Sequence, residues 1–272
     1  MDNYQANSKN AESLQDDFLY SMATHGYFIF ENIIDAKLLE ELRAGIDKAY
    51  AADKEALEAG RYKTDAFVSD VSRLLIGRDP VFEKLIEESS LQRYIDLMIG
   101  DTCIINNYSA VRLLPNVKNV VGNIHKDSPR HSPVYKLAVQ VLYFIDDFTE
   151  QTGGTWLLPG SHNAEHRPSD AFFFKNGRQI TGKAGTAMVF DSSLWHAAGF
   201  NVSDNPRRGI AIVYTRSFIK QQIDMVRAIP AAIIEKFSPK MRRLIGYNVR
   251  VPASLEEFYL PEEQRLYKGG QG

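Results

Sequence analysis

The sequence predicts a mainly β protein flanked by helices, in which two sheets pack face to face. Apolar residues recur at helical spacing before residue 100 and again after residue 220. Between 101 and 219 the period changes, and short β-rich segments are separated by Asn, Pro and Gly. Strands in the middle and helices at both ends fit a double-sheet β architecture, whose interior can hold a small ligand.

Composition limits the class of protein. The 272 residues are expected to form a single domain, with N-terminal helices at about 10–100, a β core at about 101–219 and a C-terminal helical segment at about 220–262. The 32 basic and 34 acidic residues give a formal charge of −2, which argues against nucleic-acid and membrane partners. The single cysteine, Cys103, excludes an internal disulfide and a multi-cysteine zinc site. The polar N-terminus and the lack of a long apolar run predict a cytoplasmic protein.

The first hundred residues show three helical patterns, at 11–24, 35–59 and 80–98. A short aromatic run at 27–30 indicates a buried strand. Asp35 is the expected N-cap of the second helix, and Gly60 its expected stop. The polar stretch 61–77 is either a plain connection or a loop that reaches toward a site. We expect the helices to pack outside a sheet and to carry no chemistry.

The β region begins with short segments at 103–105, 108–114 and 120–121. The stretch 135–146 is the longest and most apolar, so we expect it in the middle of a sheet. A long loop is expected at 163–178, where Phe172-Phe173-Phe174 either form a lid or pack the loop down. A turn and a strand follow at 182–191, and another strand at 207–218.

The triplet His125-Lys126-Asp127 suggests a metal site. On an extended strand, residues i and i+2 point to the same face, so the imidazole and the carboxylate can reach one point. His196 offers a third ligand far downstream; the alternative is a core histidine. Two histidines and one carboxylate form a facial triad, which is typical of non-haem Fe(II) and leaves positions open for a cosubstrate and O2. We predict these three residues to be the metal ligands and the catalytic centre.

The order of several motifs resembles a known family. The motifs are His125-Lys126-Asp127, Gly154-Thr155-Trp156-Leu157-Leu158-Pro159-Gly160-Ser161-His162, His196 and Arg207. From about Tyr27 to Phe218 the chain resembles the phytanoyl-CoA hydroxylase-like (PhyH) family of Fe(II)/2-oxoglutarate-dependent dioxygenases. The resemblance implies a double-stranded β-helix (jelly roll, cupin-like) and oxidation of a substrate C–H bond coupled to conversion of 2-oxoglutarate to succinate and CO2. Related halogenases have a small residue where this chain has Asp127, so hydroxylation, desaturation or another oxidation is implied instead.

The resemblance also implies residues for 2-oxoglutarate. Arg207 stands eleven residues after His196, where the family places the arginine that binds the far carboxylate, and a guanidinium matches a carboxylate bidentately. Arg208 is the alternative, and the two should point to opposite faces of a strand. Thr155 matches a position at which related enzymes use a hydroxyl. Asn123 matches an amide position; its alternative is a turn amide. Pro159-Gly160-Ser161-His162 is interpreted as structural.

The substrate is expected to be a small molecule, a secondary metabolite, bound by a monomer or homodimer. Candidate contacts are Tyr108, Arg112, Arg130, His131, Tyr135, Phe173 and Trp195. Arg130 and His131 would meet an acidic or polar group, or else be solvated loop residues. Two other functions stay open: a metal-dependent cupin-like enzyme without 2-oxoglutarate, which leaves Arg207 unexplained, and a non-catalytic binding member.

Overall fold

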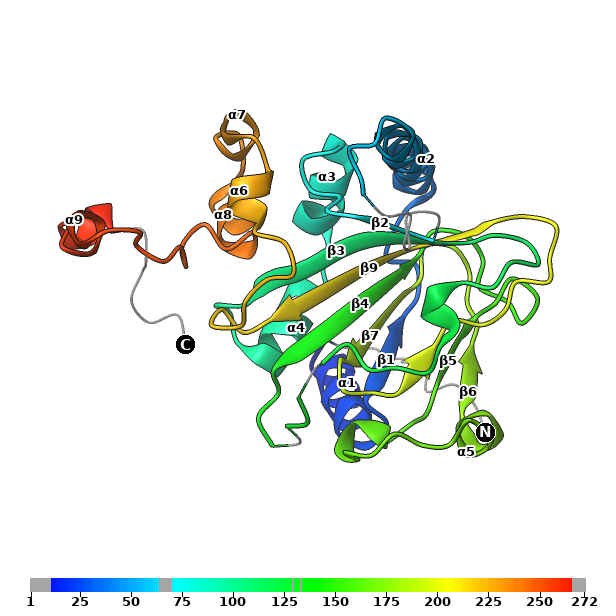
Figure 1. The fold of residues 1–272 in the computed structure, drawn as a ribbon. Coiled ribbons are helices and arrows are strands. Elements are labelled where there is room, and N and C mark those ends of the chain that lie inside the picture. Colours follow the sequence, from blue (N-terminus) through cyan, green and yellow to red (C-terminus); the bar gives the residue numbers. More distant parts are fainter. Residues whose placement is uncertain (1–10, 64–69, 129, 133, 266–272) are drawn as a thin grey trace.

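The computed structural model describes residues 11–63, 70–128, 130–132 and 134–265, and it contains two sheets (Figure 1). The large sheet has the order β1-β7-β4-β9-β3-β2, with all neighbours antiparallel. Its strands are β1 (Tyr27–Phe30), β2 (Val71–Arg73), β3 (Ile104–Leu113), β4 (Ala138–Phe144), β7 (Ala187–Asp191) and β9 (Arg207–Thr215). The small sheet has the order β6-β5-β8, formed by β5 (Thr155–Leu157), β6 (Arg178–Ile180) and β8 (His196–Ala197). The predicted mainly β class with flanking helices is confirmed, and β4 lies inside the large sheet as expected.

The large sheet has two apolar faces because β4 is buried on both sides. Val139, Val141 and Tyr143 belong to the cluster under the helices, here called the outer face. Leu142 and Phe144 point the other way and pack against the small sheet. That second cluster contains Tyr27, Ile29, Leu142, Phe144, Phe148, Leu157, Ile180, Met188, Phe190, Leu194 and Ala211. The region between the two sheets, lined by their inner faces, is called the inter-sheet space below.

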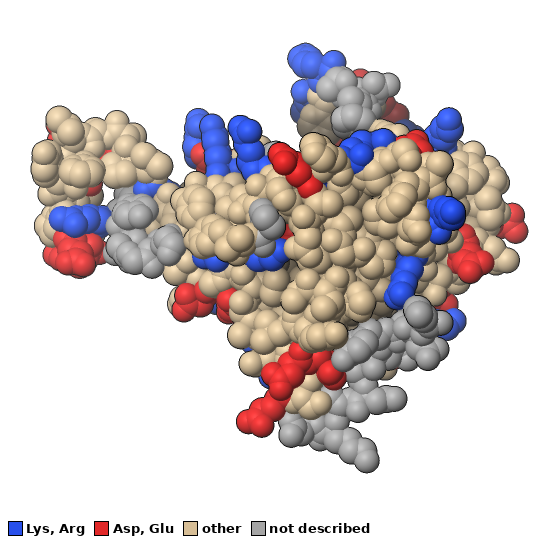
Figure 2. All heavy atoms as spheres, turned by 90° about the horizontal axis from the view of Figure 1, so that it is seen from below, with Lys and Arg blue, Asp and Glu red and all other residues tan. Residues whose placement is uncertain are grey.

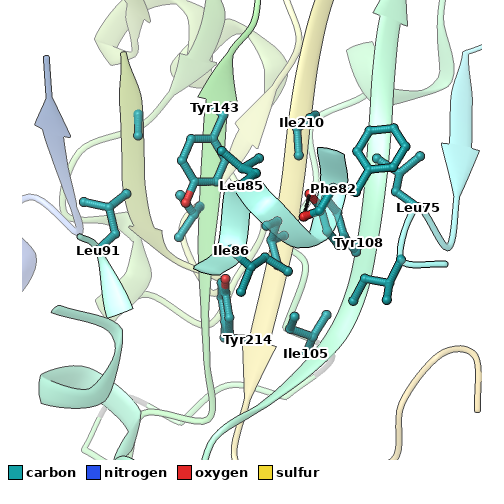
Figure 3. Close-up of a cluster of buried hydrophobic side chains, with 14 of the residues drawn as sticks. Leu75, Phe82, Leu85, Ile86, Leu91, Ile105, Tyr108, Tyr143, Ile210 and Tyr214 are labelled. Atoms are coloured by element: carbon teal, nitrogen blue, oxygen red, sulfur yellow. Dashed lines mark hydrogen bonds between the residues drawn. The ribbon is translucent and has the colours of Figure 1, made fainter. Parts of the chain in front are cut away.

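Helices α1 (Ala11–Thr24), α2 (Ala36–Glu58), α3 (Pro80–Glu88) and α4 (Gln92–Ile99) cover the outer face. Figure 3 shows Phe82, Leu85 and Ile86 of α3 against Tyr108, Tyr143 and Tyr214 of the sheet. Asp35 caps α2 as predicted, because its carboxylate accepts a 2.8 Å hydrogen bond from Leu38 N. Such a cap is worth about 1 kcal/mol.

The helix predicted over 80–98 is wrong as one element, since it is split into α3 and α4. Ser89 follows α3 with φ −66° and ψ 124°, which is extended backbone. Its hydroxyl accepts from Leu91 N and lies 3.0 Å from the Tyr143 hydroxyl. A side chain that bonds to nearby backbone competes with the helix ladder, and Ser89 accordingly ends α3.

Four other segments differ from expectation. Residues 120–122 form a 3-10 helix, η1 (Val120–Gly122), instead of a strand. The segments 103–105 and 108–114 are one strand, β3, with a bulge between Ile105 and Asn107. The three phenylalanines lie in helix α5 (Asp170–Asn176), whose N-terminus Ser169 caps, instead of a loop. The stretch 61–77 contributes strand β2, while Phe67-Val68 lies outside the described residues.

The C-terminal region is helical as predicted. It contains α6 (Met225–Ala228), α7 (Ala231–Ile234), α8 (Pro239–Leu244), α9 (Leu255–Phe258) and the 3-10 helix η3 (Glu262–Gln264). A further 3-10 helix, η2 (Ser161–Asn163), lies between β5 and α5. Met225, Met241 and Leu244 join the outer-face core, whereas Figure 1 shows α9 standing apart from the sheets. Figure 2 shows acidic and basic side chains at several separate places on one face. Within the described ranges, every helix is too short or too polar to cross a membrane.

Candidate metal centre

His125, Asp127 and His196 come together although the last two are far apart in the sequence. One ligand atom from each lies within 4.8 Å of the others. The histidines are antiparallel bridge partners: His125 N donates to His196 O at 2.9 Å, and His196 N to His125 O at 3.0 Å. Paired residues share a face of a sheet, so the two rings lie 4.2 Å apart between centroids. His196 also pairs with Leu157, which places both rings on the inter-sheet side.

Both imidazoles are held in one orientation by backbone carbonyls two residues earlier. His125 Nδ1 lies 2.7 Å from Asn123 O, and His196 Nδ1 lies 2.9 Å from Leu194 O. A carbonyl can only accept, so each Nδ1 carries the proton and donates. Each Nε2 therefore points toward the common point, where it is available to a metal. Hydrogen bonds of this kind fix the ring and the tautomer of metal-binding histidines.

The Asp127 carboxylate completes the set of candidate ligands. Its oxygens lie 3.9 Å from His125 Nε2 and 3.4 Å from His196 Nε2. Oδ2 is buried and accepts no hydrogen bond from the described residues. A buried carboxylate oxygen without a hydrogen-bond donor is unfavourable unless a cation lies beside it. The residues therefore fit a bound metal, and a set of two nitrogens and one oxygen suits Fe(II).

The ligands differ in exposure. Burial lowers the pKa of His196 to about 4, against the opposing charge of Asp127, so its ring is neutral and able to ligate near neutral pH. The His196 side chain is 7% exposed, whereas that of His125 is 35% exposed. Solvent and small molecules can therefore reach the centre from the His125 side.

Arg207 is a buried cation. It is 2% exposed, and its Nη2 donates to Gly153 O at 2.7 Å while its guanidinium lies 3.8 Å from the Phe148 ring centroid. Among the described residues, its Nε has no hydrogen-bond partner and no carboxylate pairs with its guanidinium within 4.0 Å. Burial lowers its pKa to about 9. By strand alternation it shares the inner face of β9 with Ala211. An anion in the inter-sheet space would satisfy this charge.

Arg208 points to the outer face. Its Nε lies 2.9 Å from Asp146 Oδ2, and its Nη1 lies 3.0 Å from Asp47 Oδ2 on α2. The predicted opposite orientation of the two arginines is observed, and Arg208 is already paired within the protein.

Thr155 and Asn123 have different surroundings. Thr155 is buried on β5, two residues before Leu157 and on the same inner face. The preceding Gly154 cannot carry a side chain, because a Cβ there would lie 2.4 Å from Ile180 O. The Asn123 side chain is exposed and donates to Val120 O at 3.3 Å. Asn123 contributes to the centre through its carbonyl, which orients His125.

Four of the candidate substrate residues lie away from the inter-sheet space. Tyr108 and Arg112 are on the outer face: the Tyr108 hydroxyl donates to Phe82 O at 3.0 Å, and the Arg112 guanidinium lies 3.9 Å from the ring centroid of Tyr50 on α2. Figure 3 shows Tyr108 directed at α3. Phe173 and Trp195 pack on the opposite side of the small sheet, in a cluster with Ile124, Leu158 and Ala197. The structure does not bring these four to the metal ligands.

The other three candidates lie on the segment that follows Asp127. Arg130 is exposed. His131 Nδ1 is buried without a hydrogen-bond partner among the described residues. Tyr135 is 46% exposed, and the Arg216 guanidinium lies 3.9 Å from its ring centroid. These residues remain candidates by position.

Sequence reasoning missed two features. The carbonyls of Asn123 and Leu194 orient the histidines, and backbone roles of this kind leave no residue signal. The second is the pair Gln140 and Thr215, which are buried on the inner faces of β4 and β9. The Gln140 amide inside the apolar run Ala138–Phe144 was a signal that could have pointed to it.

Comparison with known proteins agrees with this geometry. Residues 22–209 match the profile of the family described as phytanoyl-CoA dioxygenase (PhyH). The protein Mb1539 of Mycobacterium bovis, which is uncharacterized, is 34% identical over 91% of this chain and 92% of its own length. Dioxygenase trt7 of Aspergillus terreus is 28% identical over 94% of this chain and 89% of its own length.

Among solved structures, HygX from Streptomyces hygroscopicus, with nickel and 2-oxoglutarate bound, superposes with a TM-score of 0.57 at 14% identity. The match covers 79% of this chain and 89% of HygX, and it indicates a common fold. The family profile spans the small sheet, all three candidate ligands and Arg207. The chain belongs to the phytanoyl-CoA dioxygenase (PhyH) family and is a dioxygenase.

Proposed function

We propose that the protein is a non-haem Fe(II)/2-oxoglutarate-dependent oxygenase that hydroxylates, or otherwise oxidises, a C–H bond of a small metabolite. In this reaction 2-oxoglutarate is converted with O2 to succinate and CO2. The two sheets would be the halves of a double-stranded β-helix, or jelly roll, within a single dioxygenase domain. The main support for the proposal is the buried guanidinium of Arg207, which has no carboxylate partner among the described residues. It faces the same inter-sheet space as the candidate metal ligands.

Three residues would hold the iron. His125 and His196 would bind through Nε2, since each Nδ1 is committed to a carbonyl, and Asp127 would bind through a carboxylate oxygen. Bound Fe(II) supplies the redox chemistry that activates O2. The protein's own contribution is to fix three ligands on one side and leave the remaining positions to cosubstrate and oxygen.

Strand β5 connects the guanidinium to the metal ligands. Arg207 bonds to Gly153 O, two residues before Thr155; Leu157, two residues further on, pairs with His196. A five-carbon dicarboxylate bound between these residues would have one carboxylate at Arg207, the Thr155 hydroxyl beside it, and its 2-oxo acid end toward the metal ligands. The Asn123 amide could contact 2-oxoglutarate only if it gave up its hydrogen bond to Val120 O.

The substrate would be a small secondary metabolite. One HygX structure has nickel, 2-oxoglutarate and hygromycin B bound, which supports a small polar substrate by analogy of fold. A cupin-like enzyme without 2-oxoglutarate, or a non-catalytic binding member, would leave a buried cation with no ligand to pair it. Burying an unpaired charge is costly, so the 2-oxoglutarate assignment is favoured.

The test is spectroscopic. Anaerobic addition of Fe(II) and 2-oxoglutarate should produce a weak visible charge-transfer band, and air should then release succinate. The variant His196→Ala should give neither signal, and Arg208→Ala should give both. Absence of the band in the wild-type protein, with no succinate in air, would favour the alternatives. A screen of candidate metabolites by succinate release and mass change would then identify the substrate.

A further inference from the structure

Two buried polar side chains face the inter-sheet space without a partner. Gln140 on β4 is 7% exposed and Thr215 on β9 is 3% exposed. The Thr215 hydroxyl oxygen is buried and makes no hydrogen bond to any described residue. The Gln140 amide makes no hydrogen bond to a described residue either, but its nitrogen and oxygen are not among the fully buried atoms and stay within reach of solvent. Buried polar groups in folded proteins are normally satisfied, because an unmet donor or acceptor costs free energy. Both groups are therefore free to bond to something that enters from outside.

Both residues lie beside the candidate metal ligands. Gln140 is the register partner of Phe190, whose ring centroid is 5.0 Å from that of His196. Thr215 is the register partner of Ala138, and Ala138 O accepts a hydrogen bond from Ser192 N. Ser192 O in turn accepts from Asp127 N at 2.9 Å. The end of the large sheet that carries Gln140 and Thr215 is thus the end to which Asp127 is bonded.

The two groups can reach one ligand group. Gln140 pairs with Val213, and Ala138 with Thr215, so Gln140 and Thr215 are diagonal neighbours on one face. Diagonal neighbours in antiparallel strands lie about 7–8 Å apart, which a group of a few atoms bridges. The residues that flank them, Ala138, Val213 and Phe190, are uncharged. The nearby charges of Lys136 and Asp191 pair with each other at 2.8 Å, so a ligand group held here is bound through hydrogen bonds to Gln140 and Thr215.

We infer that Gln140 and Thr215 form a substrate subsite for a neutral group that both donates and accepts hydrogen bonds, such as a carboxamide or a hydroxyl. This subsite deepens the proposed function and rests on it, since the group would sit beside the carbon presented to the iron. An amide and a hydroxyl each offer a donor and an acceptor. A purely hydrocarbon substrate would leave both unpaired, and sites built to bond a hydroxyl or amide reject analogues that lack it.

The binding test uses small probes and the Zn(II)-loaded protein, with and without 2-oxoglutarate. Ligand-observed NMR measures the Kd of benzamide, benzyl alcohol and toluene for the wild type and for Gln140→Leu/Thr215→Val. The ratio of toluene Kd to benzamide Kd should fall about tenfold or more in the variant, because the bonds at stake are buried. Gln92→Leu, the same chemical change on α4, is the matched control and should leave the ratio unchanged. An unchanged ratio in the double variant would overturn the inference.

Two further measurements distinguish a substrate subsite from a structural pair and from part of the cosubstrate site. The double variant should melt at or above the wild-type temperature, because neither side chain bonds to a described residue. A melting temperature several degrees lower would show that the two side chains are structural. The Kd of 2-oxoglutarate should stay within about threefold of wild type, far below the effect of a lost buried bond. A larger loss would assign the pair to the cosubstrate and overturn the inference. If 2-oxoglutarate fails to bind even the wild type while benzamide binding still depends on Gln140, the proposed function fails and the subsite stands.

Discussion

The replacement of Arg207 by methionine tests the assignment of the 2-oxoglutarate site. Methionine keeps an apolar side chain of similar length over Phe148 but removes the charge and the bond to Gly153 O. Truncating one member of a buried, hydrogen-bonded charge pair costs about 2–5 kcal/mol. At ~1.4 kcal/mol per tenfold, the Kd of 2-oxoglutarate should rise roughly thirtyfold to several thousandfold.

The control is Arg208→Met, the same change one residue later. Arg208 contacts Asp146 and Asp47 on the outer face, so its loss should change the 2-oxoglutarate Kd by less than about threefold, which is within the range of small indirect effects. It should instead lower the free energy of unfolding by about 1–2 kcal/mol, since Arg43 still bonds to Asp146 at 3.0 Å. Arg207→Met should leave the stability of the cosubstrate-free protein nearly unchanged, because it removes a buried charge that lacks a counter-ion.

The assay is an anaerobic titration of the visible band with 2-oxoglutarate, together with urea denaturation of each variant. The two variants should show opposite patterns, one losing affinity and the other stability. If Arg208→Met weakens 2-oxoglutarate binding more than Arg207→Met, or if Arg207→Met binds as tightly as wild type, the reasoning from burial and face is refuted.

Three other perturbations have expected outcomes. Asp127→Ala removes the anionic ligand and should weaken Fe(II) binding about a hundredfold or more in a metal-competition titration; unchanged affinity would move the metal elsewhere. Asp35→Ala should lower the free energy of unfolding by about 0.5–2 kcal/mol through loss of the cap on Leu38 N, whereas Asp35→Asn should retain most of it. Burial lowers the pKa of His162 below its usual value of 6.5. The unfolded chain therefore takes up that proton first, and this stability is present above about pH 6.5 and is lost as the pH falls from there through the lower pKa of the folded state. His162→Gln should show a shallower loss of stability between pH 7 and 5 in denaturant titrations; an identical slope would contradict the shift.

Local chemistry was readable from the sequence wherever one short segment decided the outcome. The cap at Asp35, the strand at Tyr27–Phe30 and the central position of the run containing β4 follow from side-chain type and period alone. The spacing of His125 and Asp127 put two ligands on one face for the same reason. Predictions of secondary structure failed where tertiary contacts overrode the local sequence pattern. Ser89 ends α3 and bonds to Tyr143, and the phenylalanines of α5 form a helix instead of a loop.

The convergence of distant residues was decided by the tertiary structure. Only strand pairing sets His196 beside His125, and only the register of β9 sends Arg207 inward and Arg208 outward. Alternate residues of a strand point to opposite faces of the sheet, so a register shift of one residue would exchange the orientations of Arg207 and Arg208. The same alternation turned Tyr108 toward the helices and Gln140 toward the metal ligands. The residue types thus indicated the kind of chemistry, whereas the pairing of strands determined which side chains share the inter-sheet space.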